Sequence, residues 1–312
     1  MKRYNIIVNS NGLAGVIEAL LLIALVAIIM STIQLVYVPE IMKQKESDHM
    51  DEVLNQFSNL KSIIETQSMM GAIQSGQKIA YSPMSSPITL GVDRLPYFVT
   101  TFTSGQLDII DKNNAGDSEI RLLPACPYFP NGIPLTSIKF TANSNYYVPE
   151  EDQKYILEGG CIILNQTNGE TIKVAPPIAV ENNSVNNTII IYYTIPIFVC
   201  KEGKDITAGI DTNFIMTNYS KKYIHSDILD QANYYIRINS EYLEAWNKTL
   251  IHNSQHSSNG ILWEYYDNGY ISVEYDDPTN PTYIEIKPNT WDIRVEFTII
   301  EIIAQIGPGI II

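Results

Sequence analysis

The sequence predicts an α+β fold in which a long N-terminal helix precedes a mainly antiparallel β-sandwich. Three observations support this fold class. Residues 13–38 are largely apolar and carry one charge, Glu18, and a bilayer core needs about 20 largely apolar residues in a helix. Residues 50–64 carry apolar side chains at helical spacing. The rest of the chain is rich in Tyr, Ile and Thr, which favour strands.

The chain begins with a short basic leader, residues 1–12, in which Lys2 and Arg3 precede Gly12. The apolar run that follows has no small-x-small cleavage site at its far end. Either the helix stays as an uncleaved anchor, or cleavage falls before it. We therefore predict a single transmembrane helix over residues 13–38.

The direction in which this helix crosses the membrane is indicated only indirectly. Lys43 and Lys45 follow the helix closely and balance the two basic residues before it, so the positive-inside rule decides little. The short leader and the size of the C-terminal part favour a single-pass protein of the cell membrane. The large C-terminal domain is expected outside the cell.

Residues 39–70 are predicted to extend the helix as an amphipathic stalk. Pro39 lacks an N–H group and clashes with the preceding turn, which predicts a bend there. The apolar stripe must be buried, either on the chain's own domain or on neighbouring stalks, and its residues are Met50, Val53, Leu54, Phe57, Leu60 and Ile64. Residues 71–87, rich in Gly, Ser and Pro, are expected to form a junction.

Residues 88–312 are predicted to form the β-rich extracellular domain. Residues 290–298 alternate between apolar and charged side chains, which indicates a strand with one solvated face. Residues 188–199 are continuously apolar and predict a strand buried on both faces, with Pro196 marking a bulge or an edge. Residues 261–274 contain an Asn-Gly pair between two alternating runs, which predicts a hairpin. Residues 240–252 predict a helix whose inner side carries Tyr242, Leu243, Trp246 and Leu250.

The acidic composition excludes one class of partner and the sequons favour export. A formal charge of -14 with only 20 Lys and Arg argues against a nucleic-acid surface, because phosphate binding needs clustered cations. Five Asn-x-Ser/Thr sequons all follow the apolar run, and they are candidate glycosylation sites: Asn165, Asn182, Asn186, Asn218 and Asn247. Three cysteines allow one disulfide in three possible pairings: Cys126, Cys161 and Cys200.

No pattern of catalytic or metal-binding residues stands out, so we predict neither an enzyme nor a cofactor. His252 and His256 lie in a polar run without a third ligand. Residues 111–117 suggest a calcium loop but fail the EF-hand pattern at Ala115 and Leu122, which favours a polar turn. Asp276 and Asp277 are interpreted as part of a hairpin loop.

The leader and the start of the helix resemble the amino terminus of an archaeal type IV prepilin or archaellin. A basic leader ending in Gly12, directly followed by an apolar helix with Glu18 near its start, carries this resemblance. It implies cleavage between Gly12 and Leu13 by a prepilin-type peptidase. It also implies that Glu18 pairs with the amino terminus of a neighbouring subunit; the alternative is that its carboxylate reaches the lipid headgroups. The chain departs from the family pattern at Asn11, where Lys or Arg is common, and Glu18 would be sixth in the mature chain.

Several further segments are similar to those of a poorly characterised archaeal family of anchored, pilin-like surface proteins. These segments are VPEIMKQKESDHMDEVLNQFSNLKS, LGVDRLPYF, SEYLEAW, and SNYYVPEEDQKYILEGGCIILNQTNG with the following APP. The resemblance implies a structural cell-surface protein that acts in filament assembly, adhesion or surface organisation, with the membrane, copies of itself or pilin-like subunits as partners. The apolar stripe of the stalk separately predicts that Phe57→Asp disrupts assembly or stability. An anchored binding module for a glycan or an envelope partner, which does not form filaments, is the alternative.

Overall fold

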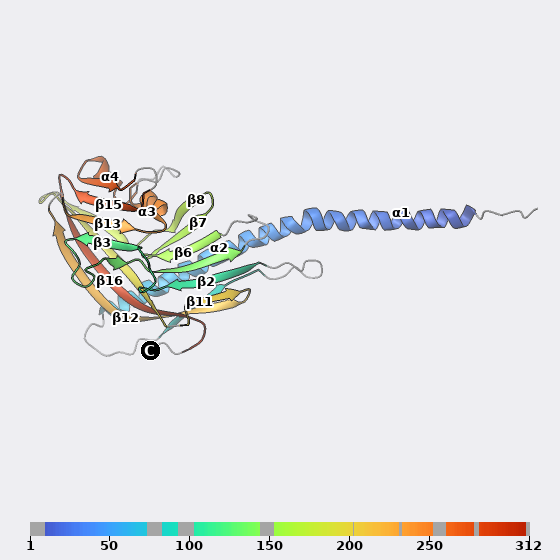
Figure 1. Ribbon diagram of the computed structural model, residues 1–312, viewed down its shortest axis with the longest axis horizontal. Helices are drawn as coiled ribbons and strands as arrows, with labels where there is room; N and C mark the ends of the chain where they lie inside the picture. The colour runs from blue at the N-terminus through green and yellow to red at the C-terminus, as the bar shows by residue number, and fades with distance from the viewer. Residues whose placement is uncertain are drawn as a thin grey trace, which may run out of the picture.

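The computed structural model describes residues 10–73, 83–92, 103–143, 153–201, 203–230, 233–251, 260–277 and 281–309, with side chains from residue 15 onward. It confirms the predicted fold class: a long N-terminal helix is followed by a mostly antiparallel, sandwich-like β domain. Helix α1 projects from the domain, and its continuation α2 runs among the sheets (Figure 1). The predicted stalk is therefore an integral part of the domain.

The helix is continuous across three segments, α1 (Ser10–Thr32), a π-helical stretch η1 (Ile33–Tyr37) and α2 (Val38–Ile73). The π-helical stretch lies directly before Pro39. Proline at this position would leave the carbonyl of Leu35 without its α-helical partner, and a local π-turn is one way in which a helix absorbs such a break. At the end of this stretch the N–H of Val38 donates to the carbonyl of Ile33, so the predicted discontinuity near Pro39 takes the form of a π-bulge.

The first sheet has the strand order β1-β12-β16-β10-β9. Its pairs are antiparallel except for β10 and β16, which run parallel over the whole length of β10. The strand bounds are Met84–Thr89 (β1), Ile178–Asn183 (β9), Thr188–Cys200 (β10), Thr212–Leu229 (β12) and Asp292–Ile306 (β16). The pairing of β9 with β10 ends at Tyr193, so β10 is an edge strand at Pro196. This confirms the interpretation of Pro196 as an edge residue.

The second sheet has the order β11-β2-β5-β6-β7-β8, and all of its pairs are antiparallel. Its strands are Ser104–Ile110 (β2), Ser137–Asn143 (β5), Gln153–Glu158 (β6), Cys161–Gln166 (β7), Gly169–Val174 (β8) and Ile206–Gly209 (β11). The third sheet has the order β14-β15-β13-β3-β4. Its strands are Glu119–Leu123 (β3), Ile133–Pro134 (β4), Tyr235–Asn239 (β13), Ile271–Tyr275 (β14) and Tyr283–Pro288 (β15).

Two hydrophobic cores lie on opposite faces of the first sheet. In the first half of β16 the odd-numbered residues Ile293, Val295 and Phe297 are buried against the third sheet and α3 (Leu243–Leu250). In the second half the even-numbered Ile300 and Ile302 are buried against α2 and the second sheet. Successive side chains of a strand point to opposite faces, so one long strand serves both cores in turn.

An irregularity in β12 shifts the pairing register of this strand with β16. The pairing shifts between Tyr219 and Lys221, as expected for a β-bulge that places an extra residue in one strand. Tyr219 packs against the core at α2, and Tyr223, beyond the bulge, packs against the other core. The extra residue lets odd-numbered side chains of β12 contact both cores.

Several local predictions can be compared with the described residues. Residues 292–297 alternate between buried and partly exposed side chains, as predicted, and α3 buries Leu243, Trp246 and Leu250. The hairpin over residues 261–274 is wrong, because its first half forms helix α4 (Trp263–Asp267). The strand over residues 188–199 is correct, but its first half alternates in burial instead of being buried on both faces.

The predicted junction, residues 71–87, overlaps a helix and a strand at its two ends, and its residues 74–82 lie outside the described residues. Residues 71–73 still belong to α2, and β1 begins at Met84. Gly71 allows the helix to pass close to the first sheet, because a Cβ there would lie 2.3 Å from the ring of Tyr219. The end of the helix is thereby held against β12.

Candidate functional site

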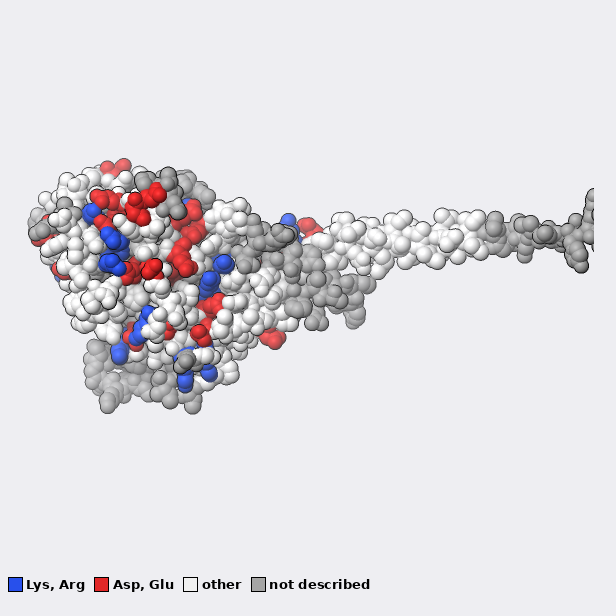
Figure 2. Space-filling model, in the orientation of Figure 1, with Lys and Arg blue, Asp and Glu red and all other residues white. Residues whose placement is uncertain are grey.

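Helix α1 is the most unusual surface of the molecule. Every described side chain from residue 15 to residue 32 is exposed. Among the described residues, one helix, Gly15–Gly71, is long and apolar enough to cross a membrane. No residue of its most apolar stretch is buried. On the face shown in Figure 2, the helix carries uncharged side chains over most of its length, whereas charged side chains gather on the domain.

The predicted processing residues and Glu18, one of the two predicted assembly residues, lie on this helix. Gly12 and Leu13 belong to its first turns, and Glu18 is exposed on its surface among apolar neighbours. A carboxylate on an apolar helix is expected to be paired, hydrated or close to a membrane interface. The structure thus places Glu18 where a partner from outside the chain can reach it.

The stripe on α2 is buried on the chain's own domain, which decides between the two partners left open by the sequence. Phe57 is completely buried in the core formed by α2, the second sheet and the first sheet. Its ring lies 6.3 Å from that of Tyr155 on β6, measured between centroids. Phe57 therefore holds the domain onto the helix, and any effect of Phe57 on assembly would act through the fold.

Two amide side chains on α2 fix it to the first sheet, and sequence reasoning missed both. Gln56 accepts a hydrogen bond from the N–H of Thr89 at 2.8 Å and donates to the Thr89 hydroxyl at 3.0 Å. Gln67 donates to the carbonyl of Thr217 at 2.8 Å. Together with the apolar stripe, these contacts give α2 a defined register on β1 and β12.

A cleft of about 540 Å³ lies where the ends of the second and third sheets meet. The ends of β2 and β6 and the start of β5 contribute residues from the second sheet, while the end of β13 and the loops before β3 and β15 contribute from the third. Its lining includes carboxylate, apolar and aromatic side chains, from Ile110, Asp117, Leu135, Glu158, Glu241 and Tyr242. Hydroxyl and amide groups also line it, from Asn114, Ser118, Ser137, Asn239, Ser240 and Thr282.

Glu158 is the buried carboxylate among the described lining residues of this cleft. The residue is only 2% exposed, and one carboxylate oxygen, Oε1, accepts from the Ser240 hydroxyl at 2.6 Å and from the indole N–H of Trp246 at 2.9 Å. Burial raises the pKa of Glu158 to about 7, and the nearby carboxylates of Glu241 and Glu170 act in the same direction. Glu158 thus joins β6 to α3 and changes its charge near neutral pH.

The turn after Glu158 explains its position. Gly159 and Gly160 both have positive φ, at 54° and 78°, a region that glycine enters readily. A Cβ on Gly159 would lie 2.5 Å from the hydroxyl of Tyr193 and 2.9 Å from the ring of Trp246. The Tyr193 hydroxyl donates to the Gly159 carbonyl at 2.8 Å. The Gly-Gly turn therefore lets Trp246 approach closely enough to bond Glu158.

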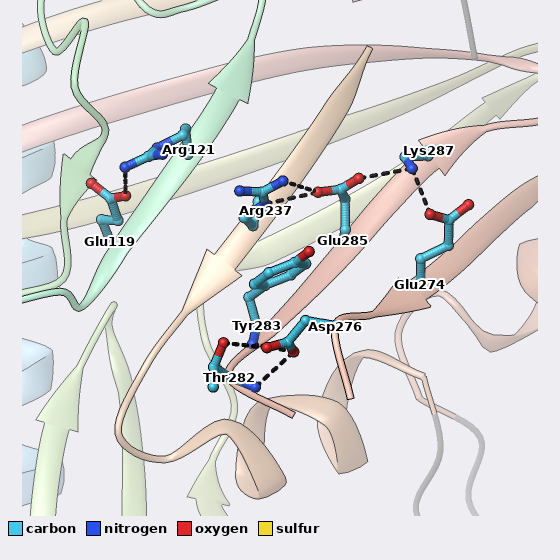
Figure 3. A network of polar contacts seen from close by, with 9 residues as sticks. All are labelled: Glu119, Arg121, Arg237, Glu274, Asp276, Thr282, Tyr283, Glu285 and Lys287. Atoms are coloured by element: carbon cyan, nitrogen blue, oxygen red, sulfur yellow. Dashed lines mark hydrogen bonds and ion pairs between the residues drawn. The ribbon is translucent and has the colours of Figure 1, made fainter. Parts of the chain in front are cut away.

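The third sheet carries a ladder of polar contacts across β13, β15 and β14 (Figure 3). Arg237 on β13 contacts Glu285 on β15 at 2.6 Å, and Lys287 bridges Glu285 at 2.8 Å and Glu274 on β14 at 2.6 Å. The guanidinium of Arg237 also lies over the Tyr283 ring, 4.2 Å from its centroid. Such cross-strand pairs stabilise neighbouring strands, so these cations are already engaged within the sheet.

The two acidic motifs noted in the sequence, around Asp111 and Asp276, form hydrogen bonds within their own loops. Asp111 is buried, and its carboxylate accepts from the backbone N–H groups of Asn113 and Asn114. Asp276 accepts from the backbone and hydroxyl of Thr282 in the loop between β14 and β15, and these hydrogen bonds lower its pKa to about 2. Both interpretations as turns are confirmed. His252 and His256 lie outside the described residues.

The three cysteines are free thiols in the structure, and a disulfide between two of them stays a prediction. Cys126 and Cys161 are buried in one core, and Cys200 is partly exposed at the end of β10. Burial raises the pKa of the Cys161 thiol and raises that of Cys200 to about 11. These two thiols are therefore neutral at physiological pH and poorly reactive.

The structure separates the five sequons by accessibility. Asn182 and Asn186 are exposed near the turn between β9 and β10. Asn165 is half-buried on β7, Asn218 has a buried carbonyl oxygen, and Asn247 accepts a hydrogen bond from the Tyr275 hydroxyl at 2.8 Å. The turn between β9 and β10 therefore offers the most accessible acceptors.

Sequence reasoning missed Glu158 and the cleft. The available signal was an acidic residue at the end of an apolar run, directly before Gly-Gly in YILEGGCII. That pattern indicates a tight turn, but its partners Ser240 and Trp246 lie far along the chain, at separations of 82 and 88 residues. Comparisons with protein-family models, with curated proteins and with solved structures found no significant match.

Proposed function

We propose that this protein is a structural cell-surface protein of pilin-like type, held by α1 in the membrane or in a bundle of like helices. One observation carries the proposal: a continuous helix is a core element of the domain in its second half and an exposed apolar rod in its first half. Large exposed apolar surfaces are covered in the functional state of a protein. A bilayer or a set of neighbouring helices would supply that cover.

The position of Glu18 supports assembly as a role for the rod. Its carboxylate lies on an exposed apolar surface, where a buried and unpaired charge would be unfavourable in lipid or in a helix bundle. A positively charged amino terminus of a neighbouring subunit would satisfy it. Cleavage between Gly12 and Leu13 would create such a terminus at Leu13.

Peptide mass spectrometry of the native protein tests this proposal. We expect the N-terminal peptide of most molecules to begin at Leu13. Intact molecules in which residues 1–12 remain joined to Leu13 would contradict processing and would leave a plain signal anchor. A Gly12→Val variant is expected to retain the leader. Asn11→Ala, directly before the residue at the proposed cut, is the matched control and should be processed like the wild type.

The cleft favours a second candidate function, an anchored binding module. A concave site with a few converging polar groups is the usual geometry for a small ligand, and this cleft has both the volume and the converging polar groups. In this function α1 is only an anchor, and the protein acts as a monomer. A measurement of the size of the full chain in detergent distinguishes the pilin-like protein from the binding module. Assembly through α1 predicts oligomers, and a Glu18→Gln variant should weaken them.

A further inference from the structure

All the charged side chains that line the cleft among the described residues are acidic. They are Asp117, Glu158 and Glu241, and no Lys, Arg or His belongs to the lining. The cations of the polar ladder on the third sheet are engaged with carboxylates of their own, as shown for Arg237 and Lys287. The potential inside a concave site with charges of one sign favours ligands of the opposite sign.

The hydrogen bonding of Glu158 leaves one of its two carboxylate oxygens free on the side of the cleft. Both protein donors bind Oε1, and Oε2 has no hydrogen-bond partner within the described part of the chain. Oε2 is not among the buried side-chain atoms that lack a hydrogen-bond partner, so it is accessible from the open cleft that Glu158 lines. The vacant oxygen is therefore available to a donor that enters from the cleft.

The spacing of the acidic groups argues against a bare metal ion in that position. No group of three or more His, Cys, Asp or Glu side chains among the described residues is placed to hold a metal ion. The three carboxylates instead surround a space with apolar contributions from Ile110 and Leu135 and an aromatic one from Tyr242. Separate acidic groups around an apolar surface suit a ligand whose positive charges are separated by methylene groups.

We propose that the cleft binds a small polyamine, with one ammonium group donating to Glu158 Oε2 and a second to Asp117 or Glu241. The methylene chain lies against Ile110 and Leu135. This site specifies a ligand for the second candidate function and does not depend on how α1 is covered. Failure of N-terminal processing would overturn the pilin-like proposal only, whereas failure of polyamine binding would overturn the ligand site only.

Proton linkage gives the proposal a distinctive signature. The carboxylates that face Glu158 are Glu241 and Glu170, with Cys161, Tyr193 and Tyr242 as its other titratable neighbours. Since burial raises the pKa of Glu158 to about 7, roughly a tenth of the carboxyl is ionised at pH 6 and roughly nine-tenths at pH 8. A ligand that binds only the ionised form gains about tenfold in affinity over this range.

Isothermal titration of the full chain in detergent micelles with spermidine, at pH 6 and pH 8 and low salt, tests the proposal. We expect binding that tightens about tenfold at pH 8. Glu158→Gln keeps an acceptor for Ser240 and Trp246, and this variant should bind more weakly and with no pH dependence. Glu274→Gln, an acidic residue outside the cleft lining, is the matched control and should bind like the wild type.

Three results would overturn the proposal. These are the absence of spermidine binding to a folded wild-type chain, an unchanged pH dependence in Glu158→Gln, and an equal loss of affinity in Glu274→Gln. If Glu158→Gln fails to fold, the exposed Glu241→Gln replaces it, with a loss of affinity expected and wild-type affinity contradicting the site. Calcium that displaces spermidine at equal concentration would contradict the ligand class.

Discussion

Neutralising Glu158 should remove a large part of the pH dependence of stability. In the folded chain burial raises the pKa of this carboxyl from its ordinary value of 4.5 to about 7. One pKa unit corresponds to about 1.4 kcal/mol of free energy, so the shift corresponds to about 3 kcal/mol. Because the folded pKa is the higher one, the folded state is favoured below pH 4.5, and this advantage is lost as the pH rises through about 7.

The assay is urea unfolding of the full chain in detergent, followed by tryptophan fluorescence, at pH values from about 4 to about 8. The wild type should lose about 3 kcal/mol of unfolding free energy over this range through Glu158 alone. The Glu158→Gln variant should lack that component. Asp276, whose pKa is lowered to about 2, contributes stability that is lost only at more acidic pH, as the pH falls below its ordinary value, so it lies mostly outside this window.

The informative quantity is the difference between the two pH profiles, because other groups contribute equally to both. A difference in unfolding free energy that changes by about 3 kcal/mol between pH 4 and pH 8 agrees with the burial of Glu158. Parallel profiles would refute the reasoning. They would mean that the carboxyl is hydrated in the folded chain, which would also weaken its role in holding α3 on β6.

The remaining predictions concern the helix, the thiols and the glycans. Phe57→Ala should lower the unfolding free energy by about 3–5 kcal/mol, because it opens a cavity in a full core. The control variant Asn59→Ala, on the exposed side of α2, should change the unfolding free energy by about 0.5 kcal/mol or less. Equal effects of the two variants in urea unfolding would show that the stripe is not buried. Alkylation with iodoacetamide should modify Cys126, Cys161 and Cys200 in urea without a reductant, and mass spectrometry that finds modification only after reduction would reveal a disulfide. Glycopeptide analysis of the native protein should find more occupancy at Asn182 and Asn186 than at Asn218 and Asn247, and the reverse order would contradict the accessibility argument.

Features set by local periodicity could be predicted from the sequence. The apolar run, the stripe that contains Phe57, and the alternation of Ile293, Val295 and Phe297 all depend on the 3.6-residue and two-residue periods of single elements. Each of these appears in the structure as a helix or a strand, and the stripe and the alternating strand have the expected buried side. The partner of the stripe was left open, since periodicity shows that a face is buried and not what covers it.

Features set by contacts between distant segments could not be predicted. The parallel pairing of β10 with β16 joins Thr188 to Asp292, and no turn residue between them encodes that register. The division of β16 between two cores is another example. Its second half contains a nearly continuous buried run, and only the neighbouring sheets determine which face each core occupies.

The wrong hairpin at residues 261–274 shows that one dipeptide can serve two local structures. Asn-Gly favours a tight β-turn, but glycine with positive φ also ends helices. Gly269 has φ at 69°, and its N–H donates to the carbonyl of Tyr266 at the end of α4. Burial of Leu262 and packing of Trp263 and Tyr265 against the core select the helix over the strand.

In the proposed function, α1 is the anchor of a domain that lies outside the cell. Proteolysis of intact cells, followed by membrane fractionation and mass spectrometry, tests this most directly. We expect an added protease to cut described loops of the β domain in intact cells, such as that at residues 184–187, while peptides from residues 15–32 stay in the membrane fraction. A domain that is protected until the cells are lysed, or an α1 recovered in the soluble fraction, would contradict the central claim.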